Sequence, residues 1–249
     1  MDAVVETDAV LAPLAGLTVV VPVGPGDKLS PLLREQLTQL PRGAQVIVVE
    51  CDAPPRPQGQ SAEPRSLALA DPPGGPRWQV LHSPAGRSLQ QNAGAAAGDG
   101  QWLWFLHADA ALAPETLRAL ARFVAEGRPG LGYFDLRFLG DGPALMRFNS
   151  VGVWLRSRVL RLPFGDQGFV LPRNLFTAVG GFDPATLRGE DHQLVWRVRR
   201  AGAPIVSIGA RLYTSARRYS SNGWAATTAR HVGETLRQAW RFSRPEHLR

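Results

Sequence analysis

The stretch "QWLWFLHADAALAPETL", residues 101–117, decides how the chain folds. Its five consecutive apolar residues, 102–106, predict a strand that is buried on both faces, as strands inside a parallel sheet are. His107 and Asp109 follow at once, and a helix over 114–125 begins at a proline, a residue favoured in the first helical turn. A buried strand that leads through polar residues into a helix is the repeating unit of an α/β fold.

Apolar runs and helical patterns alternate on both sides of this stretch. Before it, strands are predicted at 17–23, 44–49 and 78–82, and helices at 28–40 and 87–97. After it, we expect a half-exposed strand at 132–140, a helix at 144–160 and a short strand at 166–172. A helix at 191–201, a strand at 204–209 and a last helix at 224–242 should follow. The proline- and glycine-rich segment 53–76 is expected to be a surface excursion with weak helical character at 66–70. The succession predicts a doubly wound, predominantly parallel sheet with helices on both faces.

The composition limits the classes of function that the protein can have. A chain of 249 residues with 44% hydrophobic content fits a tail, 1–15, followed by one domain, 16–249. Its single cysteine excludes an intrachain disulfide, and its first residues carry acid where a secretory signal carries base, so we expect a cytoplasmic protein. All of the 28 basic residues except Lys28 are arginine, and arginine suits phosphate oxygens. Nucleic acid is not expected as a partner, because the basic residues are scattered and no reader motif occurs.

Two acids follow predicted strand ends, where ligands bind in open α/β sheets: Asp52 and Asp109. A divalent cation or a nucleobase amide would compensate a carboxylate there, although Asp109 could equally cap the following helix. Residues two apart in an extended segment point the same way, so His107 could share a pocket with Asp109. One or two such ligands plus substrate phosphates would suit Mn²⁺ or Mg²⁺, and a structural histidine is the alternative.

Other candidates are weaker taken singly. Arg87 opens a predicted helix of small residues that carries Asn92, and the amino end of this helix faces the ligand side. Each remaining pair has a functional and an ordinary explanation. Glu190 and Asp191 could take part in the chemistry or could simply stabilise the helix dipole. Asp166 and Gln167 could contact a substrate or form a turn. Arg217 and Arg218 could clamp a phosphate group or belong to a solvated loop.

Taken in order, the stretches "GRSLQQNAGAAAGDG", "FLHAD", "FDLRF", "GDQGFVL", "VGGFD", "ED" and "TSARRY" resemble family 2 glycosyltransferases of the GT-A fold. Within that family the chain looks most like the radical-SAM/selenodomain-associated transferase subgroup. The resemblance runs from about Leu17 to Phe242. It implies an inverting, metal-assisted transfer of a sugar from a nucleotide-diphosphate sugar to an acceptor that the sequence does not identify.

The resemblance also implies roles. Asp52 would bond the nucleotide base, with Arg87 and Asn92 as further donor contacts, and Asp109 would be the metal-binding acid, with His107 in place of the first acid of the family's DXD element. Asp191 would be the catalytic base. Arg217 and Arg218 would assist the leaving group, while Asp166, Gln167 and Glu190 are acceptor-side candidates.

Three alternatives stay open. The loop "PVGPGDK" departs from the family's usual sequence, so the chain could be a degenerate transferase that binds a sugar nucleotide or a partner without turnover. A nucleotidyltransferase is a second enzyme class, although that loop is only a faint version of the glycine-rich, lysine-containing one it needs. The basic, tryptophan-bearing helix 224–242 could also attach the protein peripherally to the inner face of a membrane.

Overall fold

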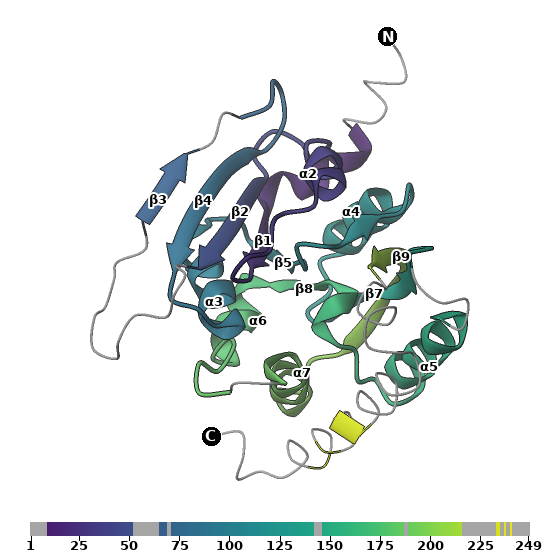
Figure 1. The fold of residues 1–249 in the computed structure, drawn as a ribbon. Coiled ribbons are helices and arrows are strands. Elements are labelled where there is room, and N and C mark those ends of the chain that lie inside the picture. Colours follow the sequence, from purple (N-terminus) through teal and green to yellow (C-terminus); the bar gives the residue numbers. More distant parts are fainter. Residues whose placement is uncertain are drawn as a thin grey trace.

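A computed structural model of the protein describes residues 9–51, 65–68, 71–141, 146–186 and 189–215, together with 233–234, 237 and 240. Within these residues nine strands form one sheet (Figure 1). The strands are β1 (Leu17–Val23), β2 (Gln45–Cys51), β3 (Arg65–Ala68), β4 (Arg77–Ser83), β5 (Trp102–Phe105), β6 (Ala111–Leu112), β7 (Leu131–Phe138), β8 (Phe169–Pro172) and β9 (Ile205–Thr214). The helices are η1 (Ala12–Gly16), α2 (Pro31–Leu37), α3 (Arg87–Ala97), α4 (Thr116–Ala125), α5 (Met146–Val159), η2 (Gly165–Gln167), α6 (Arg173–Ala178) and α7 (Glu190–Arg200).

The sheet has the strand order β3-β4-β2-β1-β5-β8-β7-β9-β6. Its four consecutive strands β4, β2, β1 and β5 are parallel, as their continuous apolar sequences predict. Beyond β5 the directions mix, because β8 runs antiparallel to both β5 and β7, whereas β7 and β9 are parallel. The chain builds outward on one side of β1 and then returns to place β5 on the other side. The crevice between β1 and β5 is therefore the topological switch point, where ligands bind in such sheets.

Helices cover both faces of the sheet, which confirms the expected α/β architecture (Figure 1). Alternate residues of β1 divide between the faces. Val19 and Val21 pack with the buried side chains of α2 and α4, whereas Val20 packs with those of α3, α6 and α7. The central strands are fully buried for this reason.

Helix α3 lies unusually close to the sheet. A Cβ atom added to Gly94 would collide with Val20 and come within 3.0 Å of Val49. The small residues of this helix thus let it approach β1 and β2, as its sequence predicts, and they hold its first residue, Arg87, at the carboxyl edge.

Several expectations differ from the structure. The weak helical character at 66–70 is wrong for 65–68, which form an edge strand antiparallel to β4. The expected tail, 1–15, contains Leu11 and Leu14, both buried in the core, so the packed chain begins before residue 16. Helix α6 was not predicted, because its six residues are too few to show a helical period.

Only four residues of the predicted helix 224–242 are described: Gly233, Glu234, Arg237 and Trp240. Among the described residues, no helix combines the length and the apolar content that a membrane span requires.

Candidate functional site

The carboxyl edge of β1 and β5 gathers most of the predicted site residues. His107 and Asp109 follow β5, and the backbone N–H of Ser30, after β1, donates to the carbonyl of Ala108 at 2.8 Å. Strand β8 pairs antiparallel with β5 so that Phe169 faces Phe105. The turn η2 immediately before β8 consequently lies at the same edge and brings Asp166 there.

Asp191 is held against the backbone of η2. Its Oδ2 accepts a hydrogen bond from the N–H of Gly165 at 3.1 Å, and its Oδ1 is buried and has no hydrogen-bond partner in the described structure. Burial raises the pKa of the Asp191 carboxyl, whereas the guanidinium of Arg87 and the Gly165 N–H act in the opposite direction. The result is a desolvated carboxyl group with one oxygen bonded to the backbone and the other buried without a hydrogen-bond partner in the described structure.

Glu190 lies beside Asp191 at the start of α7. Its Oε1 is 3.6 Å from Nη1 of Arg87, whose side chain is 44% exposed. Burial raises the pKa of Glu190 to about 7, with the neighbouring Asp191 adding to the rise and Arg87 opposing it. Arg87 therefore faces two carboxyl groups, which joins the amino end of α3 to the amino end of α7.

Asp166 is a third carboxyl group in this cluster. Burial raises its pKa to about 6; the charges of Asp191 and Asp109 add to the rise, and those of Arg156 and Arg87 oppose it. These charges can act on Asp166 only because each of the four side chains lies near it. The cluster brings together residues that the sequence separates by almost half its length.

Asp109 and His107 are both half-buried at the end of β5. The Asp109 carboxylate accepts a long hydrogen bond, 3.5 Å, from the hydroxyl of Thr214 at the end of β9. Among the described residues no group of three or more His, Cys, Asp or Glu side chains could hold a metal ion. One carboxylate and one imidazole fit a divalent cation only if a bound ligand, such as a diphosphate, supplies the other oxygens.

Two predicted contacts have internal structural roles instead. Gln167 is completely buried, and its amide bonds Arg156, Ser157, the backbone N–H of Phe164 and the carbonyl of Phe134. Asn92 donates to the carbonyl of Phe182 at 2.7 Å and accepts from the N–H of the same residue at 3.0 Å. Neither amide is directed at a ligand, so both act by fixing the loops around the site.

Sequence reasoning missed Arg156. Its guanidinium stacks over the ring of Phe164, with Cζ 3.5 Å from the centroid, and donates to Gln167 at 3.2 Å. Its positive charge opposes the rise in the pKa of Asp166, and it lies on a helix whose several arginines look alike in the sequence. Gly165 was also missed, although glycines on both sides of Asp166 and Gln167 were a usable signal of a close approach.

Asp52, Arg217 and Arg218 lie outside the described residues. Asp52 directly follows β2, and the two arginines follow β9 shortly after Thr214.

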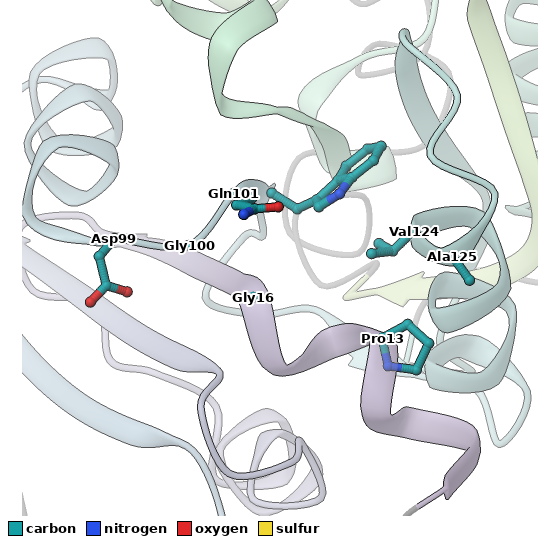
Figure 2. A pocket seen from close by; sticks show the side chains of 8 residues that line it. Pro13, Gly16, Asp99, Gly100, Gln101, Val124 and Ala125 are labelled. Carbon is teal, nitrogen blue, oxygen red and sulfur yellow. The ribbon is translucent and has the colours of Figure 1, made fainter.

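A hollow at the opposite edge of the sheet is not part of this site (Figure 2). It lies near the amino ends of β1 and β5, between Gly16, Gln101 and Val124. Its only described ionisable side chain is Asp99, which pairs with Arg77 at 3.0 Å. The described lining of this hollow therefore lacks the cluster of buried carboxyl groups found at the carboxyl edge.

Comparisons with known proteins identify a similar family and similar folds. Residues 61–183 match the model of Glycosyl transferase family 2. No curated protein matches the chain. The structure of S. aureus TarS 1–349 in complex with UDP-GlcNAc superposes with a TM-score of 0.54 at 15% identity, over 80% of this chain and 58% of that one. The mannosyltransferase PcManGT from Pyrobaculum calidifontis, in complex with GDP-Man and Mn²⁺, gives 0.52 at 17% identity, over 78% and 56%.

At these identities the structural likeness establishes the fold, which is that of GT-A glycosyltransferases. The chain spans less than two thirds of the length of these solved proteins.

Proposed function

We propose that the protein is a glycosyltransferase that moves a sugar from a nucleotide-diphosphate sugar to an acceptor, with inversion at the sugar carbon. The observation that carries the proposal is the buried Asp191 carboxylate, held by Gly165 and facing Arg87 at the switch point of a GT-A sheet. The family match over 61–183 and the nucleotide sugars bound to two similar structures support it.

In this mechanism Asp191 takes the proton from the acceptor hydroxyl as that oxygen attacks the sugar carbon, and the bond to the nucleoside diphosphate breaks on the opposite side. The raised pKa of Asp191 makes it a stronger base than an exposed carboxylate. The Arg87 guanidinium opposes the rise in the pKa of Asp191 and so favours its ionised form. The Arg87 side chain is partly exposed and could also contact the donor.

The departing diphosphate needs positive charge. Asp109 and His107 would hold a divalent cation, Mn²⁺ or Mg²⁺, whose contribution is to offset the charge that develops on the phosphate oxygens. Arg217 and Arg218 remain proposed donor contacts on the sequence alone, as does Asp52 for the base. Glu190, whose pKa is raised to about 7, would share a proton with the acceptor near neutral pH. Asp166, whose pKa is raised to about 6, would bond the acceptor mainly as a carboxylate. Assignment to the radical-SAM/selenodomain-associated subgroup and a cytoplasmic location are part of the same proposal.

Donor binding tests this proposal before an acceptor is known. A panel of nucleoside diphosphates and nucleotide sugars is screened by thermal shift, with and without Mn²⁺, on the wild type and on Asp109→Ala. We expect one base to stabilise the wild type in a manner that needs both Mn²⁺ and Asp109. Asp99→Ala at the opposite edge is the control and should keep the full shift. If no nucleotide stabilises the wild type at millimolar concentration, the proposal is wrong.

A further inference from the structure

Helix α5 presents four large apolar side chains to solvent, whereas two of its serines are buried together with Met146. On its inner side Ser150 is 4% exposed and Ser157 is 1% exposed. On its outer side the exposed fractions are 59% for Val151, 46% for Trp154, 53% for Leu155 and 62% for Val159. A helix on the surface of a protein in water usually turns its polar side to solvent, so four exposed apolar side chains are unusual.

These outer residues form a continuous surface. Val151, Leu155 and Val159 recur every four residues and so share one side of the helix, and Trp154 lies next to Leu155. Leu160, directly after the helix, is 57% exposed and extends the surface. We call these five residues the α5 stripe. Single exposed apolar residues are ordinary, but a contiguous set marks an interaction site.

The charge around the α5 stripe is entirely of one sign along the chain. Residues 142–165 contain four arginines and no acid. Arg158 is paired with Asp135 at 2.8 Å, but Arg161 is exposed, and Arg199 reaches from α7 to donate to the carbonyl of Leu160 at 3.2 Å. Cationic groups thus gather at the end of the apolar surface.

We propose that the α5 stripe docks on the surface of a lipid bilayer that contains anionic lipids. Aliphatic side chains and a tryptophan would enter the boundary of the acyl region, while guanidinium groups would contact phosphate head groups. Exposed apolar residues on α5, with the positive charges of Arg161 just after the helix and of Arg199 on α7 at one end of the stripe, match that chemistry.

Docking of this face would place the candidate site beside the bilayer. The inner side of α5 carries Arg156 and Ser157, both of which bond Gln167 in η2. The surface of the helix and the site are therefore joined through one layer of side chains. Attachment does not depend on sugar transfer, so its test is independent of the proposed function.

Co-sedimentation of the full chain with vesicles tests the docking. Phosphatidylcholine vesicles with and without phosphatidylglycerol are compared for the wild type, for Leu155→Ser with Val159→Ser, and for Arg161→Gln. The matched control is Val10→Ser with Leu32→Ser, which removes two aliphatic residues of 42% and 47% exposure elsewhere on the surface.

We expect the wild type to bind the anionic vesicles and to bind neutral ones less. The α5 double variant should lower the partition coefficient at least about tenfold, Arg161→Gln should lower it less, and the control should leave it unchanged. Absence of vesicle binding by the wild type, or equal losses in the two double variants, would overturn the proposal. Light scattering could also overturn the proposal. If the wild type is a dimer and the α5 double variant is a monomer, the stripe contacts a second copy of the chain.

Discussion

At the scale of single residues, the site is a group of carboxyl groups that lack enough positive partners. Asp166, Glu190 and Asp191 all have raised pKa values from burial, and the positive charges that oppose the rise are those of Arg87 and Arg156, assisted by backbone N–H groups. Such an arrangement costs stability and is kept where the chemistry needs it. Nearby His192 is affected in the opposite sense, because burial and Arg156 lower its pKa to about 4.

Asp166→Asn should stabilise the protein at alkaline pH. The pKa of Asp166 is about 6 in the folded protein against 3.8 for the ordinary group, so the folded state binds the extra proton and the wild type loses stability as pH rises through this window. The variant should gain roughly 3 kcal/mol well above pH 6 and nothing below about pH 4. Urea unfolding of both proteins across this range measures the difference, in which the contribution of His192 cancels. An equal gain in the free energy of unfolding at pH 4 and pH 8 would show that the raised pKa of Asp166 is not its cause.

Arg87→Gln should move the acid limb of activity to higher pH. Arg87 lowers the pKa of Asp191 and that of Glu190, so its removal lets both hold their protons longer. Because Arg87 is 44% exposed, solvent screening limits the shift to less than about one pH unit. The pH profile of kcat/KM gives the result, with Arg77→Gln at the opposite edge as control. A lower rate with an unmoved limb would restrict Arg87 to donor binding.

At the scale of elements, the site depends on how closely one backbone approaches one carboxylate. A Cβ atom on Gly165 would lie within 2.6 Å of Oδ1 of Asp191. The turn η2 and the first turn of α7 can pack in this way only because residue 165 has no side chain.

Gly165→Ala should therefore displace Asp191 and lower kcat by about 100-fold, the usual cost of a misplaced catalytic group. Donor affinity, measured by thermal shift, should change little, because the displaced group faces the acceptor. Gly140→Ala is the control, since a Cβ atom there meets nothing within 4 Å. An unchanged kcat in Gly165→Ala would mean that the position of Asp191 does not matter to turnover.

Gly94→Ala should push α3 away from the sheet. The added methyl group would collide with Val20 and press on Val49, and overpacking of this kind costs about 1–3 kcal/mol. Chemical denaturation should show this loss, whereas Ala96→Leu, on the exposed side of the same helix, should be nearly neutral. Equal stability of Gly94→Ala and the wild type would contradict the close packing.

Elements with a clear period were predictable from the sequence. The bounds of β1 and α3 agree with the predicted 17–23 and 87–97, because continuous apolar runs and small-residue helices leave little choice. Strand β3 and the direction of β8 were not predictable from the sequence, because tertiary contacts decide the pairing of an edge strand and the antiparallel direction of a strand. The two amides were misjudged for a similar reason. A sequence shows that Asn92 and Gln167 are polar, but not that backbone groups of Phe182 and Phe134 already occupy them.

At the scale of the whole molecule, strand order alone locates the site. The reversal at β1 and β5 brings Arg87, Asp109, Asp166 and Asp191 to one edge, and the fold of GT-A glycosyltransferases follows from this topology. The position of Asp109 at a strand end was predictable from its place after five apolar residues. Its encounter with Asp166 and Asp191 was not, because it requires the order of strands that are far apart in the sequence.

The α5 stripe belongs to the same scale. It lies on the segment between β7 and β8, which contributes Arg156 to the site and Val151, Leu155 and Val159 to the surface. Helix α5 thus contributes residues both to the candidate site and to the surface proposed to contact the membrane.

The most direct test of the central claim is release of nucleoside diphosphate from a panel of nucleotide sugars by the wild type, by Asp191→Asn and by the control Glu126→Gln, an exposed residue far from the site. We predict that the wild type and Glu126→Gln cleave at least one donor at the same rate. Asp191→Asn should bind that donor equally well but cleave it about 100-fold or more slowly. Release that is unaffected by Asp191→Asn, or a wild type that binds a donor without cleaving it, would contradict the account.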